Sequence, residues 1–361
     1  MKPNGRAAAV LGLGILLLAP GPGHPQPFPR GYLFNDSHFH LTNYIQEGVD
    51  IREFLGIMGT KVERVALFGI PLQQQWSHRD SGDTAPTYYL DTDAPLYYYS
   101  FTDAYIAQAY LTLSEQQRAR FDPMITGFNP ADMYAADHIR RVLLTFPGVF
   151  SGIGEFTVHK EFVSSKVAGE VASLQDPALD RVLDFAGEVG LAAILHCDID
   201  VPFPKKGARP MYLAQMKALL RRHPATTIIW AHMGVGRVIR PVEHHGAVLE
   251  EMLRDPAFRH VHFDISWDLV ARYVVASEES IRSGADLVNR YPDRFLFGTD
   301  EVAPRTADGY FKVFEVYEPL WRLLTPEASE KVRKGNYERI FDAARARARA
   351  WERSHAARGV G

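Results

Sequence analysis

The stretch YLFNDSHFH, residues 32–40, decides the fold that we expect for this chain of 361 residues. It is short, rich in apolar residues and bounded by glycine or a polar turn, as a strand buried on both faces of a parallel sheet is. His38 and His40 stand two positions apart, so on a strand both side chains point to one side while Phe39 points to the other. The pair is either the first half of a metal site or two histidines that happen to lie on a strand.

Seven further runs share the features of the first, and they are residues 64–70, 123–129, 150–156, 192–198, 227–234, 261–267 and 295–301. Amphipathic segments with apolar residues at helical spacing lie between them. Most steps between strands are roughly 25 to 40 residues, the size of a βα unit. Eight units predict a closed (β/α)8 TIM barrel. An open doubly wound sheet is the alternative, but it normally carries a glycine-rich phosphate loop after its first strand, and no such pattern follows residue 40.

Two regions extend this barrel. The long connection between strand 2 and helix 2 begins with a polar, tyrosine-rich segment at the rim where barrel active sites form. Its rings, Tyr98 among them, either line a substrate pocket or pack against the barrel. Residues 310–324 and 330–341 have helical patterns, which predict extra C-terminal helices. We expect a barrel domain over residues 26–345 and a solvated C-terminal tail over residues 346–361.

The first 25 residues have the pattern of a secretory signal peptide followed by a Pro/Gly-rich linker. A short basic start precedes an apolar run of about thirteen residues, which is short for a bilayer span. An uncleaved N-terminal anchor is the alternative. Cys197 is the only cysteine, so the chain forms no internal disulfide. We therefore expect an exported protein, periplasmic or secreted, whose stability comes from its core.

The composition limits the partners of the protein. The formal net charge is -3 and the chain has no basic block, so binding to nucleic acid by phosphate neutralisation is not expected. Hydrophobic residues make up 46% of the chain, enough for a large buried core. A small-molecule substrate is the expected partner, and no stable membrane span is expected apart from the N-terminal anchor considered above.

Four further predicted strands end in side chains that bind metals, namely Glu155, His196, His232 and Asp300. Each follows an apolar run, where a buried strand meets its loop. An unpaired carboxylate buried there would cost several kcal/mol, and coordination to a cation removes that cost. Each residue alone could make an ordinary hydrogen bond at the rim. Their coincidence at the C-terminal ends of strands predicts one metal site of imidazole and carboxylate, which suits zinc, manganese, iron or cobalt.

The motifs DSHFH, GIGE, LHCD, AHMG and FGTD, in this order, resemble those of the amidohydrolase superfamily, in particular its amidohydrolase-2 branch of metal-dependent hydrolases and related decarboxylases. The late GNYERIF resembles the closing helix of that branch. The resemblance extends from about Asp36 to Phe341 and covers nearly all of the chain after its N-terminal segment.

The resemblance implies a role for each motif residue. The implied metal ligands are His38, His40, Glu155, His196 and Asp300. Asp300 is also the implied proton acceptor, and His232 is implied as a ligand or a catalytic group. Glu155 matches a carboxylate that bridges two metals in some relatives. The resemblance therefore leaves open whether the site binds one divalent ion or two, and the expected metal is zinc. Relatives are often dimers, so the resemblance also leaves open whether this protein is a homodimer.

These roles predict a hydrolase. A cation can lower the pKa of a water to about 7, and Asp300 can take the proton and return it to the leaving group. The bond cleaved would be an amide, ester or lactone in a small aromatic or carboxylate-bearing substrate. Hydrolysis is favoured because Glu155 could hold a second cation and because export suits the breakdown of an external compound. Non-oxidative decarboxylation, with His232 as proton donor to carbon, and an exported metal- or ligand-binding protein without turnover are the alternatives.

Residues after the strands are candidates for substrate binding. Arg237 closely follows strand 6 and either clamps a substrate carboxylate or forms a salt bridge at a helix start. Asp264 and Trp267 end strand 7 and are expected to line the pocket. Lys160 is a further cationic candidate, with His159 and Arg305 as weaker ones.

Overall fold

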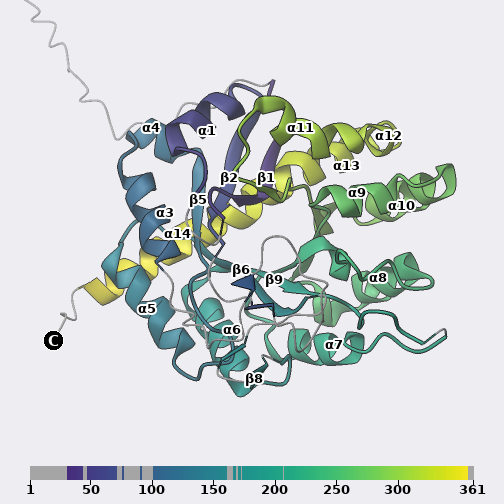
Figure 1. Ribbon diagram of the computed structural model, residues 1–361, viewed down its shortest axis with the longest axis horizontal. Helices are drawn as coiled ribbons and strands as arrows, with labels where there is room; N and C mark the ends of the chain where they lie inside the picture. Colours follow the sequence, from purple (N-terminus) through teal and green to yellow (C-terminus); the bar gives the residue numbers. More distant parts are fainter. Residues whose placement is uncertain are drawn as a thin grey trace, which may run out of the picture. The chain divides into compact units, whose positions relative to one another are not determined.

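The sheet in the computed structural model has nine strands, and its two edges come from one stretch of chain. All pairs are parallel, in the order β12-β11-β10-β9-β6-β5-β2-β1-β13. The edge strands β12 and β13 both lie within residues 295–302. Between them Ser37 N donates to Phe297 O at 3.1 Å and Asp300 N donates to His38 O at 2.8 Å. The eighth predicted strand therefore closes the sheet, and the (β/α)8 barrel is confirmed (Figure 1).

The structure describes residues 31–43, 47–70, 101–160, 173–205 and 207–356, and four two-residue strands between these ranges. The barrel strands are β1 (Phe34–His40), β2 (Val62–Phe68), β5 (Phe121–Ile125), β6 (Gly152–His159), β9 (Ala192–Cys197), β10 (Ile228–Trp230), β11 (Val261–Asp264), β12 (Phe295–Leu296) and β13 (Glu301–Val302). Two short pairs join β3 (Gln75–Trp76) to β4 (Leu90–Asp91) and β7 (Lys166–Val167) to β8 (Glu170–Val171). The expected signal segment and Tyr98 lie outside the described residues.

The helices lie on the outer side of the ring of strands (Figure 1). They are α1 (Ile51–Met58), α3 (Thr102–Leu111), α4 (Glu115–Arg118), α5 (Ala135–Thr145), α6 (Pro177–Val189), α7 (Leu213–Arg222), α8 (His245–Arg254), α9 (Asp268–Val274), α10 (Glu278–Arg290), α11 (Ala307–Val316), α12 (Glu318–Trp321), α13 (Pro326–Glu330) and α14 (Asn336–Ala356). None of these helices is both long and apolar enough to cross a membrane.

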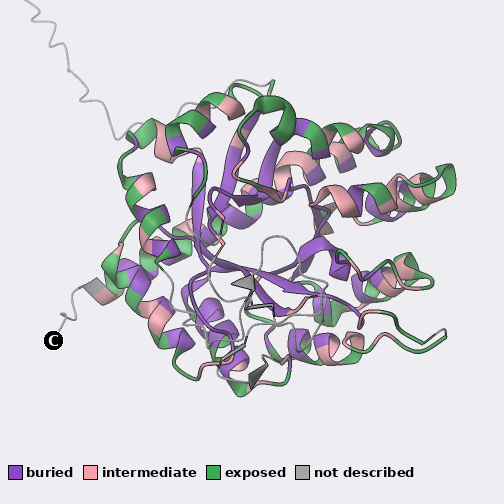
Figure 2. Ribbon diagram, in the orientation of Figure 1, coloured by how far each residue is buried: buried purple, intermediate pink, exposed green. Residues whose placement is uncertain are grey.

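Side chains of the first strand alternate in direction, as the sequence predicts, although all of its residues are buried. The strands are mostly buried, with the exception of β13, while the helices expose one side (Figure 2). Phe39 points to the helix layer, where its ring stacks on that of Phe54 in α1, with centroids 3.9 Å apart and an interplanar angle of 5°. His38 and His40 therefore face the interior of the barrel.

The C-terminal helix α14 covers one end of the barrel. Its residues Tyr337, Phe341 and Ala344 belong to the same buried cluster as Met124 and Leu296 of the strands. The helix continues to Ala356, through most of the segment expected as a solvated C-terminal tail.

One face of the last turns of α14 is buried, and the other is exposed to solvent. Trp351, inside the expected tail, is only 7% exposed. The arginines of the alternating ARARAR pattern donate to backbone carbonyls elsewhere in the barrel: Arg345 to Phe121 O, Arg347 to Gly187 O and Arg349 to Phe150 O. The alternation of charges suggested solvent, but these long side chains reach back to the barrel.

A buried ion-pair network connects α14 to the strands around Asp122. This carboxylate is 1% exposed and accepts hydrogen bonds from Arg64 Nη2 at 2.8 Å, Arg345 Nη2 at 2.7 Å and Tyr337 Oη at 2.8 Å. Burial alone would raise the pKa of Asp122, but the Arg64 and Arg345 guanidinium groups lower it below its ordinary value.

We expect Asp122→Ala to lower the free energy of unfolding by about 3–5 kcal/mol, because it leaves the charge of Arg64 buried without this partner. Since the pKa of Asp122 is lower in the folded than in the unfolded state, its contribution is full above pH about 4 and decreases as the pH falls further. Urea unfolding measures both effects. The matched control is Asp342→Ala, which removes another partner of Arg64 whose side chain is 63% exposed, and we expect it to cost less than about 1 kcal/mol. Equal losses in the two variants would contradict the prediction.

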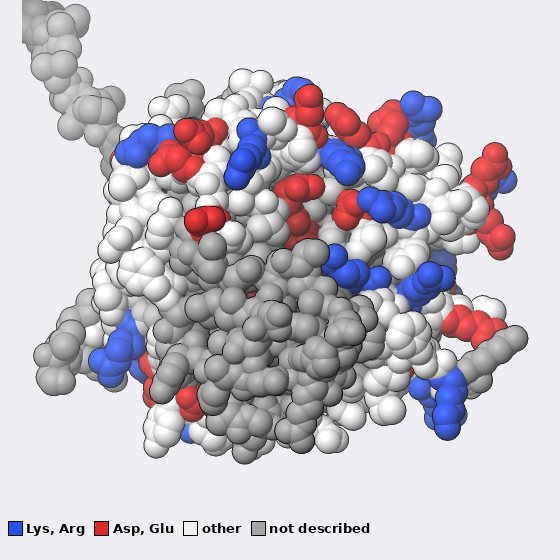
Figure 3. Space-filling view, in the orientation of Figure 1, with Lys and Arg blue, Asp and Glu red and all other residues white. Residues whose placement is uncertain are grey.

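Charges of both signs are mixed on the face of the molecule shown in Figure 3. Among the residues drawn in colour there, basic and acidic side chains lie next to one another along the edge of the view, and neither sign forms a continuous field. This distribution agrees with the small net charge of the chain, -3.

Candidate metal centre

Six side chains converge at the C-terminal ends of the barrel strands. They are His38 and His40 of β1, Glu155 of β6, His196 of β9, His232 just after β10, and Asp300 between β12 and β13. Asp300 is partly exposed, and the other five residues are buried. The structure therefore brings together every residue that the sequence predicts for the metal site and its chemistry.

The two histidines of β1 face the same two carboxylates. His38 Nε2 lies 3.3 Å from Asp300 Oδ1 and 3.6 Å from Glu155 Oε2. His40 Nε2 lies 3.2 Å and 3.6 Å from the same two oxygen atoms. Four donor atoms, from β1, β6 and the connection between β12 and β13, thus surround one small space, as ligands of a cation do.

His232 lies next to the second oxygen atom of each of these two carboxylates. Its Nε2 lies 3.5 Å from Glu155 Oε1 and 3.8 Å from Asp300 Oδ2. Its Nδ1 lies 2.9 Å from Ser266 Oγ. Among the residues that the structure describes, two groups of side chains could hold a metal ion: His38 with His40 and Asp300, and His38 with Glu155 and His232.

Two nitrogen atoms of this cluster show that a metal fits. His38 Nε2 and His232 Nε2 are buried and have no hydrogen-bond partner among the described residues. A buried polar atom without a partner costs about 1–3 kcal/mol. Coordination to a divalent cation would satisfy both nitrogens, and it would neutralise the two carboxylates beside them.

His196 lies in the cluster but is oriented differently from the ligand that the sequence predicts. Its Nδ1 lies 2.5 Å from Glu155 Oε1, and its Nε2 lies 3.2 Å from Asp198 Oδ1. Both ring nitrogens therefore face carboxylates, and neither belongs to the two groups that could hold an ion. In this geometry His196 contacts Glu155, and its role as a metal ligand stays a prediction.

Asp264, which the sequence predicts to line the pocket, contacts two histidines of the cluster. It is 0% exposed, and its Oδ2 lies 2.9 Å from His38 Nδ1. Its Oδ1 accepts from His232 N at 2.9 Å and from Ser266 Oγ at 2.5 Å. A carboxylate that accepts the Nδ1 proton of a histidine leaves Nε2 as the ligand atom. Asp264 is therefore a positioning residue for both His38 and His232, and Ser266 is a further one that the sequence did not reveal.

Asp36 is a second positioning residue that sequence reasoning missed, although it begins the DSHFH motif. Its carboxylate accepts hydrogen bonds from His38 N at 3.0 Å, Thr299 N at 2.9 Å and Tyr310 Oη at 2.8 Å. Burial raises the pKa of Asp36 to about 6, although these hydrogen bonds oppose the shift. The contacts attach β1 to the loop that carries Asp300. A buried aspartate directly before two histidines was the available signal.

Backbone conformation aims three of the side chains. His232, Trp267 and Asp300 have positive φ values of 56°, 81° and 52°. Such a conformation costs a residue other than glycine about 1–3 kcal/mol, and surrounding structure must hold it. For His232 the consequence is visible, because β10 ends at Trp230 and Ala231–Gly234 form a helical turn, η1, where the sequence predicts strand up to residue 234.

Electrostatics keep both carboxylates ionised. Burial alone would raise the pKa of Asp300, but His38, His40 and His232 lower it far below its ordinary value. Burial would likewise raise the pKa of Glu155, but Lys160 and His196 lower it well below its usual range. The same pairing raises the pKa of His38, against the effect of its burial, because Asp300 and Asp264 are close. A cation would take the place of the protons that these pairs attract.

Two of the residues predicted to bind substrate, Lys160 and Arg237, lie around a third, Trp267, at the edge of the cluster. The Trp267 ring lies 5.1 Å from the ring of His232. Lys160 Nζ lies 5.8 Å and the Arg237 guanidinium carbon 5.7 Å from the centroid of Trp267. His159 instead stacks on Tyr212, with centroids 3.8 Å apart.

The fold and this cluster define the class of a metal-dependent TIM-barrel enzyme with its site at the C-terminal ends of the strands. The model of the family described as Amidohydrolase matches residues 36–343, and this chain belongs to that family. The family includes hydrolases and decarboxylases and is metal-dependent. The resemblance seen in the sequence motifs is thereby confirmed.

Solved structures share the fold at low sequence identity. An uncharacterised TIM-barrel protein from Bordetella bronchiseptica has 14% identity and a TM-score of 0.52, with 86% of this chain and 99% of that chain covered. An amidohydrolase from Burkholderia multivorans has the same four values. A protein from Pseudomonas putida provisionally named 2-pyrone-4,6-dicarboxylic acid hydrolase has 14% identity and a TM-score of 0.50, covering 86% and 98%. A comparison with curated proteins finds no match.

Proposed function

We propose that this protein is a metal-dependent hydrolase that cleaves an amide, ester or lactone bond of a small organic substrate. One observation supports the proposal above the others. Two buried imidazole nitrogens, His38 Nε2 and His232 Nε2, lack hydrogen-bond partners among the described residues, and both lie within 3.8 Å of the Asp300 carboxylate. A metal site and a candidate general base therefore share one space.

The proposed ligands are His38, His40, Glu155 and Asp300, with His232 beside them. When bound, a divalent cation supplies Lewis acidity, which lowers the pKa of a water and polarises a substrate carbonyl. His38 offers one free nitrogen, because its Nδ1 faces Asp264, and both groups that could hold an ion use His38. This sharing supports one ion, and nitrogen and oxygen donors support zinc.

Asp300 is the proposed general base. It is ionised at neutral pH because the neighbouring imidazoles lower its pKa, and its side chain is 12% exposed, against 0% for His38. It can accept a proton at a carboxylate oxygen and return it to the leaving group. Ser266 Oγ donates to Asp264, so His232 Nδ1 donates to Ser266 Oγ. The Nε2 lone pair of His232 is therefore directed toward the same space and can bind the cation.

The charge around Trp267 supports an anionic, planar substrate. Lys160 and Arg237 both lie within 6 Å of this ring, which in turn lies beside His232. A carboxylate-bearing aromatic or unsaturated ring could stack on Trp267 while its carboxylate pairs with either cation. The name of the Pseudomonas putida protein refers to a dicarboxylic acid, which agrees with this proposal.

A substrate panel tests the proposed function. We expect turnover of aryl esters, lactones or N-acyl amides that a chelator removes and zinc restores. Within each pair of neutral and carboxylate-bearing substrates, we expect the carboxylate-bearing one to have the higher kcat/KM. Carbon dioxide release from aromatic acids without hydrolysis would instead identify a decarboxylase. Tight ligand binding without turnover of any substrate would identify a binding protein.

A further inference from the structure

Glu155 receives a hydrogen-bonded contact from each of the two strands that flank β6. In the sheet, β6 lies between β5 and β9. From β9, His196 contacts the Glu155 side chain, with its Nδ1 2.5 Å from Oε1. Thr126, which directly follows β5 and is 0% exposed, donates its hydroxyl hydrogen to the backbone carbonyl of Glu155 at 2.7 Å. Glu155 is therefore supported at both its side chain and its backbone.

The sheet is irregular at the position of Glu155. The pairing of β5 with β6 ends at Ile125 and Ile153, before Glu155 is reached. The pairing of β6 with β9 shifts register between Ile153 and Phe156. Irregularities of this kind redirect side chains and are common next to active sites. Because the regular ladder is interrupted here, the hydrogen bond from Thr126 fixes the backbone at Glu155 and, with it, the direction of the Glu155 side chain.

Thr126 is itself held by a buried carboxylate. Asp103, in the first turn of α3, is 3% exposed. Its Oδ1 accepts from Thr126 N at 2.8 Å, and its Oδ2 accepts from Gly127 N at 3.0 Å. Burial raises the pKa of Asp103 to about 7, although both backbone N–H groups oppose the shift. Asp103, Thr126 and Glu155 thus form a continuous series of hydrogen-bonded contacts from α3 to the metal centre.

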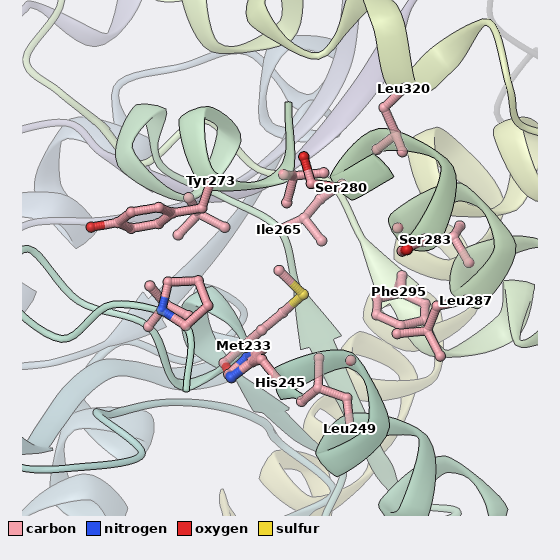
Figure 4. Close-up of a pocket in the computed structure, with 17 residues that line it drawn as sticks. Met233, His245, Leu249, Ile265, Tyr273, Ser280, Ser283, Leu287, Phe295 and Leu320 are labelled. Atoms are coloured by element: carbon pink, nitrogen blue, oxygen red, sulfur yellow. The ribbon is translucent and has the colours of Figure 1, made fainter. Parts of the chain in front are cut away.

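The histidine side of the metal centre has a different kind of support. Met233 directly follows His232 in the chain. Ile265 directly follows Asp264. Both line a mainly apolar pocket among α8, α9 and α10 (Figure 4). Support on that side includes apolar packing, whereas the contacts of Thr126 are hydrogen bonds, and a substitution of similar shape can remove the hydroxyl without leaving a cavity.

We propose that Thr126 is a positioning residue for Glu155, whose carboxylate it directs toward the metal, and that Asp103 acts on Glu155 through Thr126. This inference rests on the proposed function, because Glu155 is a ligand of the proposed metal. Removal of a residue that orients a ligand typically costs about 10–100-fold in metal affinity.

Zinc titration into chelator-treated protein tests the role of Thr126. The experiment is run at pH about 8, above the pKa of Asp103. Thr126→Val keeps the shape of the side chain and removes the donor, and we expect the dissociation constant of zinc to rise about 10–100-fold. Thr126→Ser keeps the donor, and we expect it to restore the dissociation constant to within about threefold of the wild-type value.

Thr226→Val is the matched control. Thr226 is 1% exposed and donates its hydroxyl hydrogen to the Leu183 carbonyl at 2.7 Å, just before β10 begins. Both valine variants lose one buried hydrogen bond, so we expect similar decreases of the thermal midpoint, at most about 4 °C, in the metal-free proteins. Zinc affinity should decrease only in Thr126→Val. Equal zinc affinity of the two valine variants would overturn the proposal, as would a serine variant that fails to restore binding.

A double variant tests whether Asp103 acts through Thr126. We expect Asp103→Asn alone to raise the dissociation constant of zinc about three- to tenfold. The same change should add little in Thr126→Val, where the hydroxyl that contacts Glu155 is already absent. Additive effects would overturn the role of Asp103. These titrations need no substrate, so a wild type that binds zinc but turns over no substrate would contradict the proposed hydrolysis alone. A wild type that binds no zinc would overturn both.

Discussion

Asp300→Asn is expected to lower kcat by about 10²–10⁴, the usual contribution of a general base, while the purified protein keeps most of its metal. The amide keeps an oxygen that can face His38 and His40, but it cannot take up a proton at neutral pH. The wild-type carboxylate can, because it is ionised beside three imidazoles. Turnover of the best panel substrate and elemental analysis of the same preparation measure the two quantities.

The next residue in the chain offers a matched control for this experiment. Glu301 is partly exposed and lies outside the two groups that could hold an ion. Burial, followed by the charge of Asp300, raises the pKa of Glu301 to about 7. We expect Glu301→Gln to change kcat only a few-fold. Full activity in Asp300→Asn would rule out Asp300 as the base, while loss of metal together with activity would assign it to coordination alone.

His38→Ala is expected to remove the metal and to lower kcat/KM by about 10³ or more, whereas His196→Ala should keep measurable metal. His38 offers its free Nε2 to both groups that could hold an ion, and His196 belongs to neither. Loss of a cation forfeits several kcal/mol of transition-state stabilisation, and each 1.4 kcal/mol is a factor of ten in rate. Loss of a supporting residue typically costs only 10–100-fold in metal affinity or activity.

Metal titration into chelated protein separates these two roles. The dissociation constant of zinc should rise far more in His38→Ala than in His196→Ala. His223→Ala is the control, since this buried histidine pairs with Asp180 and Asp184 in another part of the fold. If both cluster variants lost zinc equally, His196 would be a direct ligand, and its ring would have to turn away from Asp198 when the metal binds.

Local patterns predicted much of the fold and of the cluster. Apolar runs ending in polar residues indicated eight strands, and the spacing of His38 and His40 showed that both face the interior. The second glycine of the GIGE motif is also required for a physical reason. Gly154 has φ +112°, and an added Cβ would lie 2.2 Å from Ile194 O, so only glycine fits directly before Glu155.

Patterns along the chain did not show the orientation of side chains or their distant contacts. The arginines of α14 have the pattern of a solvated stretch, and only the tertiary structure shows that Arg345 and Arg349 donate to carbonyls of the barrel. His196 had the correct position for a ligand, but Asp198 and Glu155 hold its two nitrogens.

The sequence by itself determined the barrel, the family and the side chains that gather at one end of the strands, because strand periodicity and motif order are local properties. Only the tertiary structure decided which of these side chains face a common space and which support them. Asp264 shows the reason: its oxygens contact residues 226 and 32 positions away. Hydrogen bonds between such distant residues are set by how the strands pack around the barrel, and no spacing along the chain reveals them.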